Sequence, residues 1–189
     1  MVEDVKAQVC ECVETIRGCE PLLEDLAQAA ETLIECLYQG GIVAFCGNGG
    51  SASQAQHFAA ELVGRFRRER QAFRALSLSA DGPILTAVGN DYCFEDIFAR
   101  QVEGLLRAGD VLVGLSTSGR ARNVCKAFEV GRKLGLKLIA FTGCDSGQLG
   151  PLAHLELRVP SNVTARVQEA HLLLGHLLCD LVEAALARP

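Results

Sequence analysis

The chain has 189 residues, which is enough for one domain with a sizeable core. A hydrophobic fraction of 49% and a charged fraction of 22% exclude a disordered polypeptide. The formal net charge of −5 argues against a general nucleic-acid binder, although five arginines between residues 65 and 74 form a local basic patch. That patch is as typical of a solvated surface as of a surface that faces phosphate.

The nine cysteines mostly stand singly within apolar runs, and none forms a Cys-x-x-Cys pair. An odd number of cysteines in this setting is typical of free thiols in a reducing cytoplasm. The first residues are charged and lack a signal-peptide core, and no apolar run approaches the roughly 20 residues needed to span a bilayer. We therefore expect a cytoplasmic protein that does not associate with membranes.

Residues 3–39 place apolar side chains at helical spacing, with one interruption at residues 18–21, where Pro21 can begin a second helix but cannot continue the first. We predict two helices that end at the glycines 40 and 41. Beyond them, strands and helices alternate. Strands are predicted at residues 42–46, 73–79, 111–115, 136–141 and 155–159, and helices at residues 51–63, from 83, 94–106, 124–134 and 165–187.

Strands separated by helices of this length indicate right-handed crossovers and an α/β fold, in which helices cover both faces of a five-stranded parallel sheet. No stretch has the composition of an interdomain linker. We expect one domain over residues 1–189, with residues 1–39 as an N-terminal helical segment.

The predicted strand at residues 42–46 runs into Cys-Gly-Asn-Gly-Gly-Ser at residues 46–51, immediately before a helix. A glycine turn that opens a helix offers backbone N–H groups and the positive end of the helix dipole to an anion. A second small polar turn, residues 116–120, follows the third strand, and both turns belong at the carboxyl edge of the sheet, where ligands bind in such folds. The pair predicts a phosphate site, although glycine turns and serine caps also serve ordinary strand-to-helix connections.

Neither turn completes a nucleotide-binding motif. The first lacks the Gly-Lys-Ser/Thr ending of a P-loop, and Gly-Asn-Gly at residues 47–49 does not extend to the dinucleotide pattern. We therefore disfavour nucleotide binding.

His57 and Glu61 are four residues apart on the helix after the first turn and so share one face. The apolar stripe of that helix, which includes Phe58 and Leu62, points elsewhere. Both polar side chains therefore flank the predicted phosphate site. The pattern alone also fits a surface ion pair.

The last predicted helix carries Gln168, His171 and His176. Its apolar stripe is centred on Leu174, Leu177, Leu178, Leu181 and Ala185. This places His171 at the border of the stripe, as a core or interface histidine, and His176 almost opposite it. Further leucines on the His176 side make the helix apolar nearly all round, which indicates burial against a neighbouring element or another subunit.

Five motifs stand in order along nearly the whole chain: Cys-Gly-Asn-Gly-Gly-Ser at 46–51, His-Phe-Ala-Ala-Glu-Leu at 57–62, Gly-Asn-Asp at 89–91, Ser-Thr-Ser-Gly at 116–119, and Gln-Glu-Ala-His with the later His at 168–176. Together they resemble the bacterial sedoheptulose 7-phosphate isomerases, also called phosphoheptose isomerases, of the sugar isomerase (SIS) domain superfamily. The resemblance implies a flavodoxin-like sheet, a homotetramer with active sites near subunit interfaces, and a zinc ion. It also implies conversion of D-sedoheptulose 7-phosphate to D-glycero-D-manno-heptose 7-phosphate, the first step towards the heptose of lipopolysaccharide or other surface glycans.

By this resemblance, His57, Glu61, Gln168 and His176 match the metal ligands of the family, and Glu61 and His176 also match its general base and acid. The positions that match substrate contacts, with Ser51 beside them, are Asn48, Gly49, Gly50, Asn90, Asp91, Ser116, Thr117, Ser118 and Gln168. A carboxylate and an imidazole can move protons through an enediolate near neutral pH, and zinc accepts both kinds of ligand.

Two departures from the family pattern concern the substrate. Arg120 and Ala121 replace Asn and Ser after the Ser-Thr-Ser-Gly turn, which removes a hydroxyl and adds a guanidinium that could take over its role at the phosphate. Ala165 stands where the family commonly has Asp near the sugar.

Two other classes of function fit part of the sequence. A non-catalytic branch of the superfamily forms tetramers that bind the replication initiator DnaA, but it lacks the catalytic Glu and His, whereas Glu61 and His176 are both present here. A phosphosugar-sensing regulatory domain would need only the phosphate site and usually a partner domain, for which this chain has no room.

Overall fold

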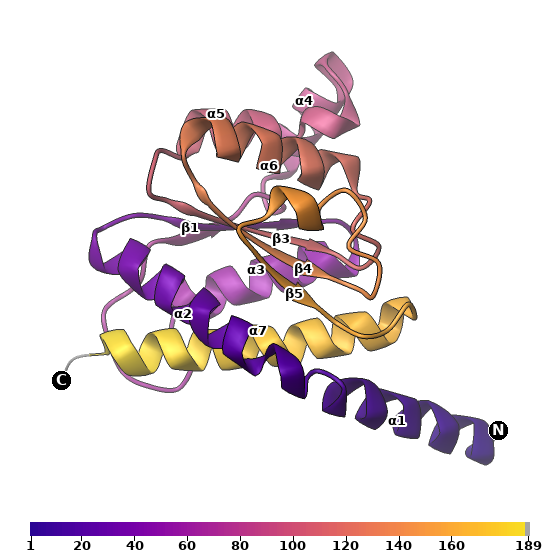
Figure 1. Cartoon of the computed structure of the whole chain (residues 1–189). Coiled ribbons are helices and arrows are strands. Elements are labelled where there is room, and N and C mark those ends of the chain that lie inside the picture. The colour runs from indigo at the N-terminus through magenta and orange to yellow at the C-terminus, as the bar shows by residue number, and fades with distance from the viewer. Residues whose placement is uncertain (188–189) are drawn as a thin grey trace.

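The computed structural model describes residues 1–187 and contains a five-stranded parallel sheet in the order β2-β1-β3-β4-β5 (Figure 1). The strands are β1 (Val43–Gly47), β2 (Ala75–Ser77), β3 (Val111–Ser116), β4 (Lys137–Thr142) and β5 (Leu155–Arg158). Strand β1 pairs with β3 from Val43↔Val111 to Gly47↔Leu115, so their carboxyl ends are level. This register brings the two polar turns predicted from the sequence to one edge of the sheet.

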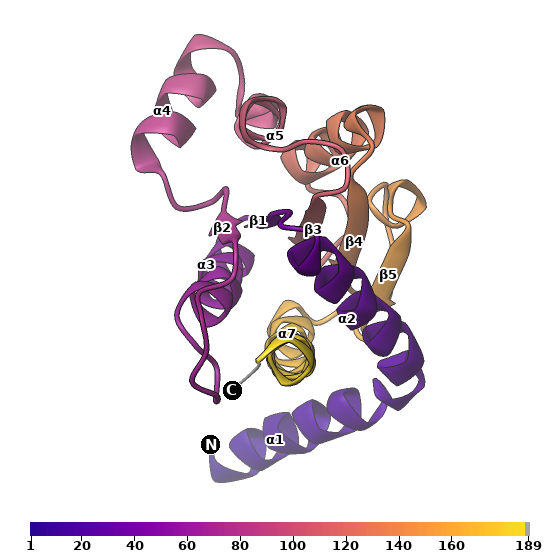
Figure 2. The same ribbon diagram turned by 90° about the vertical axis from the view of Figure 1, so that its left-hand side faces the viewer.

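The helices are α1 (Val2–Arg17), α2 (Leu23–Tyr38), α3 (Gly50–Val63), α4 (Gly82–Asp91), α5 (Ala99–Leu105), α6 (Arg122–Leu134) and α7 (Thr164–Leu186), with short 3-10 turns η1 (Glu20–Leu22), η2 (Phe94–Asp96) and η3 (Gly150–Leu152). Helices α2, α3 and α7 cover one face of the sheet, and α5 and α6 cover the other (Figure 2). The predicted parallel sheet with helices on both faces and N-terminal helices before it is confirmed.

The sheet separates two apolar cores because successive side chains of a strand point to opposite faces. On β3, Val111, Val113 and Leu115 pack towards α3 and α7, whereas Leu112 packs towards α5 and α6. All residues of β1 and β3 are buried, as expected for central strands covered on both sides. The α3 and α7 layer carries the candidate site.

Two predicted elements are shorter than expected. The strand predicted at residues 73–79 extends only over β2, an edge strand paired with β1 alone. The helix predicted at residues 94–106 is divided into η2 and α5, because Ile97 and Phe98 between them turn into the core, where both are buried.

The apolar stripe predicted for α7 was only partly right. Leu174 and Leu178 are buried, but Leu177 and Leu181 are exposed. His171 lies fully within the buried face rather than at its border. Helix α7 therefore has a core-facing side and a second, solvent-exposed row of leucines.

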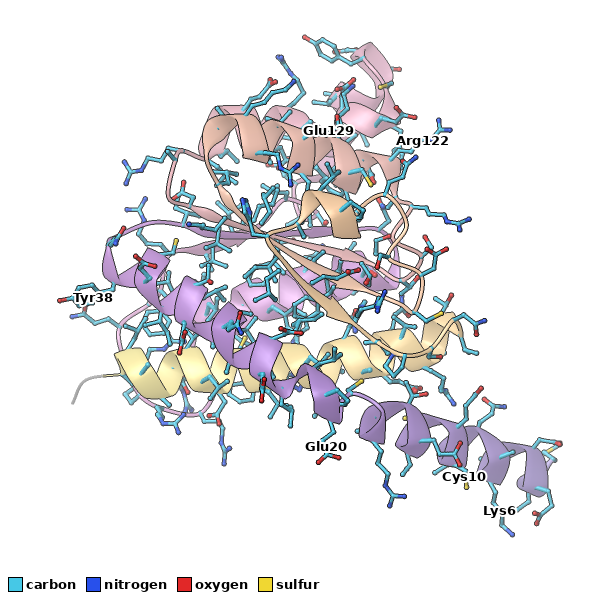
Figure 3. The ribbon with its side chains drawn as sticks, in the orientation of Figure 1. Lys6, Cys10, Glu20, Tyr38, Arg122 and Glu129 are labelled. Atoms are coloured by element: carbon cyan, nitrogen blue, oxygen red, sulfur yellow. The ribbon has the colours of Figure 1, made fainter. Side chains whose placement is uncertain are left out.

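Helix α1 projects beyond the N-terminal end of α7, away from the sheet (Figure 1). The side chains of Lys6 and Cys10, labelled in Figure 3, point outwards from this helix. Among residues 1–187, no helix has both the length and the apolar character that crossing a membrane requires.

Candidate active site

The two polar turns, from which the sequence predicts a phosphate site, line a pocket at the carboxyl edge of β1 and β3. Gly49 has φ +56° immediately before α3, a conformation that side chains rarely adopt, so the turn depends on glycine. The pocket has a volume of about 360 Å³. It is lined by Asn48, Gly49, Gly50, Ser51, Leu115, Ser116, Thr117, Ser118, Ala121, Thr164 and Gln168. We call it the cradle pocket.

Asn48 joins the first turn of the cradle pocket to the start of α6. Its side-chain amide donates to Asn123 Oδ1 at 2.9 Å, and the Asn123 amide donates back to Asn48 Oδ1 at 2.8 Å. Asn123 also accepts the backbone N–H of Val124 at the start of α6. The reciprocal pair holds the first turn against the beginning of α6.

Helices α3 and α7 lie side by side and run in the same direction from the cradle pocket. At their first turns, the Gln168 amide lies so close to Gly50 that a β-carbon there would be 2.4 Å from Gln168 Nε2. Gln54 Nε2 donates to the Gln168 carbonyl oxygen at 2.6 Å. About two turns further along both helices, His57 meets His176.

We call the line of contact between α3 and α7 the seam. His57, Glu61 and His176 form a compact cluster on it. Nε2 of His57 lies 2.8 Å from Nε2 of His176 and 3.4 Å from Oε1 of Glu61. The three residues are partly buried, and their nearest ligand atoms all lie within 4.8 Å of one another. The structure thus joins His176, which the sequence could not place, to the predicted pair on α3.

The donor types of this cluster fit zinc, and two of its three donor spacings lie near those of a zinc site. Two imidazole nitrogens and one carboxylate oxygen are a donor set typical of catalytic zinc sites. Tetrahedral zinc with bonds of about 2.0 to 2.1 Å separates neighbouring donors by about 3.3 Å. The 3.4 Å between His57 and Glu61 matches this value, and the two imidazoles need to part by only a few tenths of an ångström.

Gln168 lines the cradle pocket, and its contact with the substrate stays a prediction. Its side chain lies against Gly50, about two turns before His176 along α7. Its role as a metal ligand stays a prediction.

Asn90 and Asp91 are exposed at the end of α4, where Asn90 Nδ2 donates to Asp91 Oδ1 at 2.9 Å. Neither lines the cradle pocket. An adjacent apolar pocket of about 550 Å³ shares Asn48 and Gly49 with it and reaches under α4 to Gly89, but it includes neither residue. Their contact with substrate stays a prediction.

The departures from the family pattern lie at the rim. Ala121 lines the cradle pocket at the start of α6, and Ala165 is exposed in the first turn of α7. Arg120 is ion-paired with Asp145 and lines a smaller neighbouring pocket of about 250 Å³ that also contains Thr117 and Ser118. Its guanidinium stands beside the cradle pocket rather than forming its wall.

Several residues of the site were not found from the sequence. Asn123, Gln54 and Thr164 each support or line the cradle pocket through contacts between distant segments. Phe66 stacks its ring on His176, with centroids 5.5 Å apart and planes inclined by 28°. Thr164 and Asn123, each beside a predicted helix start, carried a local signal, because Thr and Asn are residue types favoured there.

The buried cysteines and His171 do not take part in the site. Burial raises the pKa of Cys179 to about 12, so this thiol stays neutral and packs as a small apolar group. All nine cysteines are free thiols, as predicted. His171 donates from Nε2 to the Thr142 carbonyl oxygen at 3.1 Å, and burial lowers its pKa to about 4.

Comparison with known proteins shows the family of the chain. A family model described as SIS domain matches residues 9–143. A phosphoheptose isomerase of Helicobacter pylori (strain P12) is 51% identical over 88% of this chain and 87% of its own length. One from Akkermansia muciniphila is 45% identical over 97% of each chain. The solved structure of a phosphoheptose isomerase from Neisseria gonorrhoeae superposes with a TM-score of 0.92 at 42% identity, covering 96% of this chain and 98% of that one. The chain belongs to the phosphoheptose isomerases of the SIS domain family.

Proposed function

We propose that the chain interconverts D-sedoheptulose 7-phosphate and D-glycero-D-manno-heptose 7-phosphate, an aldose–ketose isomerisation that begins heptose supply for surface glycans. The observation that carries this proposal is the convergence of Glu61 and His176, from α3 and α7, on the seam that starts at the cradle pocket. One end of the seam offers phosphate ligands, and the other offers an acid and a base.

The spacing along the seam supports a long sugar phosphate. His57 follows Gly50 by seven residues on α3, a rise of about 10 Å at 1.5 Å per residue. In sedoheptulose 7-phosphate, the phosphate and the reacting carbons 1 and 2 occupy opposite ends of the carbon chain. A substrate whose phosphate lies in the cradle pocket would therefore present these carbons to Glu61 and His176.

The isomerisation requires two proton movements, and the cluster supplies a group for each. Glu61 takes a proton from carbon 1 and returns it to carbon 2, while His176 donates to the carbonyl oxygen on carbon 2 and accepts from the hydroxyl on carbon 1. Both groups end in their starting protonation states, and the intermediate is an enediol. His57 Nε2, 2.8 Å from His176 Nε2, orients the His176 ring.

His57, Glu61 and His176 would hold the zinc ion, with Gln168 as the fourth predicted ligand. When bound, zinc supplies a Lewis acid that stabilises negative charge on the sugar oxygens. The polar lining of the cradle pocket then retains the phosphate and keeps the sugar aligned.

We also propose that the chain works as a homotetramer. Valines 2, 5, 9 and 13 are exposed on α1, and Leu172, Leu177 and Leu181 are exposed on α7. Apolar rows of this kind on two helices are typical of surfaces covered by another subunit. A neighbouring subunit would also explain why Asn90 and Asp91 stand outside the pocket of their own chain. Sedimentation equilibrium of the wild type and of the double variant Val5→Lys/Val9→Lys would test this, because added charges should dissociate the assembly.

The experiment that tests the function is turnover of sedoheptulose 7-phosphate by the purified protein, before chelation, after chelation and after zinc is restored. We expect turnover to disappear with the chelator and to return with zinc, at one zinc per chain measured by mass spectrometry. Absence of turnover from a folded protein under every condition would instead favour the initiator-binding alternative, which binding to purified DnaA would then test directly.

A further inference from the structure

Residues 64–74 connect α3 to β2 and lie against the C-terminal half of α7, beyond the His57, Glu61 and His176 cluster (Figure 2). We call this segment the basic connection, because it carries the arginine patch noted in the sequence. None of the roles assigned above requires it to be basic. Its contacts with α7 centre on one buried carboxylate.

That carboxylate is Glu183, whose side chain is completely buried. It accepts three consecutive backbone N–H groups, from Phe66 to Oε1 at 2.9 Å and from Arg67 and Arg68 to Oε2 at 2.7 and 2.8 Å. Arg70 Nε lies 3.2 Å from Oε1, and the Arg70 side chain is itself only 2% exposed. Successive N–H groups and a buried guanidinium together form an anion-binding concavity around Glu183.

We expect Glu183 to be ionised in these surroundings. Burial by itself raises the pKa of the carboxyl group, but the N–H groups of residues 66–68 and the Arg70 charge together bring that pKa below its ordinary value. A buried carboxylate costs folding free energy unless it is paired and hydrogen-bonded, and here it is both. Removing the charge leaves polar groups of the basic connection without their partner.

Both ends of this network reach the catalytic residues. Phe66 donates its backbone N–H to Glu183 and stacks its ring on the imidazole of His176. Arg70 donates from Nη2 to the Glu61 carbonyl oxygen at 2.8 Å and from Nη1 to the Gly64 carbonyl oxygen at 2.9 Å, which ties down the C-terminal turn of α3. Glu183 thus acts on one catalytic side chain through Phe66 and on the backbone of the other through Arg70.

We propose that Glu183 is a positioning residue for the isomerisation: by fixing the basic connection, it sets the ring orientation of His176 and the end of α3 that carries Glu61. The inference rests on the proposed function, because positioning matters only if these two residues exchange protons with substrate. The cradle pocket is at the opposite end of the seam and includes neither Glu183 nor its partners. Loss of Glu183 should therefore slow chemistry without weakening phosphate binding.

The test compares Glu183→Gln, Phe66→Leu and the control Asp180→Asn in steady-state kinetics on the zinc-loaded enzyme. Asp180 is on the same helix and binds the Arg68 side chain of the basic connection at 2.7 Å, but it is partly exposed. We expect kcat to fall roughly 10- to 100-fold in the first two variants, with KM within about twofold of wild type, and Asp180→Asn to match wild type. The double variant Glu183→Gln/Phe66→Leu should lose little more than either single variant, because both act on His176.

A second measurement does not depend on turnover. Histidine-selective NMR of the zinc-free protein, with His176 assigned by His176→Asn, should show a displaced His176 signal in Glu183→Gln and Phe66→Leu and an unchanged one in Asp180→Asn.

Folded Glu183→Gln and Phe66→Leu proteins with wild-type kcat, or with an unmoved His176 signal, would overturn the proposal. So would a rise in KM at constant kcat. If Glu183→Gln does not fold, the kcat and the His176 signal of Phe66→Leu alone decide whether the proposal stands. An inactive wild type would refute the isomerase function, while the NMR comparison would still decide whether Glu183 orients His176.

Discussion

Gly175 of α7 faces the ring of Phe58 on α3 so closely that a β-carbon at residue 175 would lie 2.1 Å from Phe58 Cζ. Phe58 is fully buried between the sheet and α7 and cannot withdraw. The neighbours of these two residues in the chain are His57 and His176. The absence of a side chain at position 175 is therefore what lets the two imidazoles meet.

Gly175→Ala should force α3 and α7 apart and separate His57 from His176. We expect kcat to fall at least about tenfold and zinc affinity to weaken, since a misplacement near 1 Å can cost about a hundredfold in rate. Turnover and zinc retention during dialysis against a chelator would measure the two effects. Gly104→Ala is the matched control, because a β-carbon there meets nothing within 4 Å. Equal activity of both variants would contradict the role of Gly175.

Glu61→Gln should remove the proposed general base while preserving the size of the side chain. We expect kcat to fall by roughly a factor of 10² to 10⁴, the usual contribution of a positioned base, with the protein still folded. Steady-state kinetics together with zinc content would separate loss of the base from loss of the metal. Glu69→Gln is an exposed control on the basic connection. Near-normal turnover by Glu61→Gln would show that another group takes the proton.

His171 makes stability depend on pH. Its pKa is about 4 in the folded chain and near 6.5 when unfolded, so between these values the unfolded state binds more protons. The contribution is complete above pH 6.5 and is lost as the pH falls towards 4, by about 3 kcal/mol in total at 1.36 kcal/mol per unit. Urea unfolding of wild type and His171→Gln at pH 7 and pH 5 measures this. We expect the free energy of unfolding to fall less in the variant than in wild type between the two pH values. Equal losses would exclude His171 as the source of the pH dependence.

Arg120→Ala should weaken substrate binding more than it slows chemistry. Arg120 lines the pocket that shares Thr117 and Ser118 with the cradle pocket, so its positive charge attracts a phosphate bound there. We expect KM to rise about three- to tenfold at low salt with kcat nearly constant, and the difference to shrink as salt screens the charge. Arg122→Ala is the control, because that exposed arginine, labelled in Figure 3, lines neither pocket and pairs with Glu95. An unchanged KM for Arg120→Ala would show that the guanidinium does not contribute.

Local features of the sequence predicted much of the fold and two of the three residues of the cluster. The alternation of strands and helices follows from periodicity within short windows, and the His57 and Glu61 pair needs only the geometry of one helix. The glycine turn at residues 46–51 can likewise be recognised from the local sequence, because Gly49 adopts a backbone conformation that other residues rarely reach. The α7 stripe was misjudged because leucines occur on two faces of that helix, one towards the core and one towards solvent.

What the sequence by itself determined, therefore, is the α/β alternation, the cradle turns and the pair on α3, since each arises within a few residues. Only the tertiary structure decided that His176 joins that pair, that Asn123 braces Asn48 and that Glu183 holds the basic connection. These contacts join segments more than 70 residues apart. They depend on the parallel approach of α3 and α7 over a common sheet and on the level ends of β1 and β3, which no local pattern encodes.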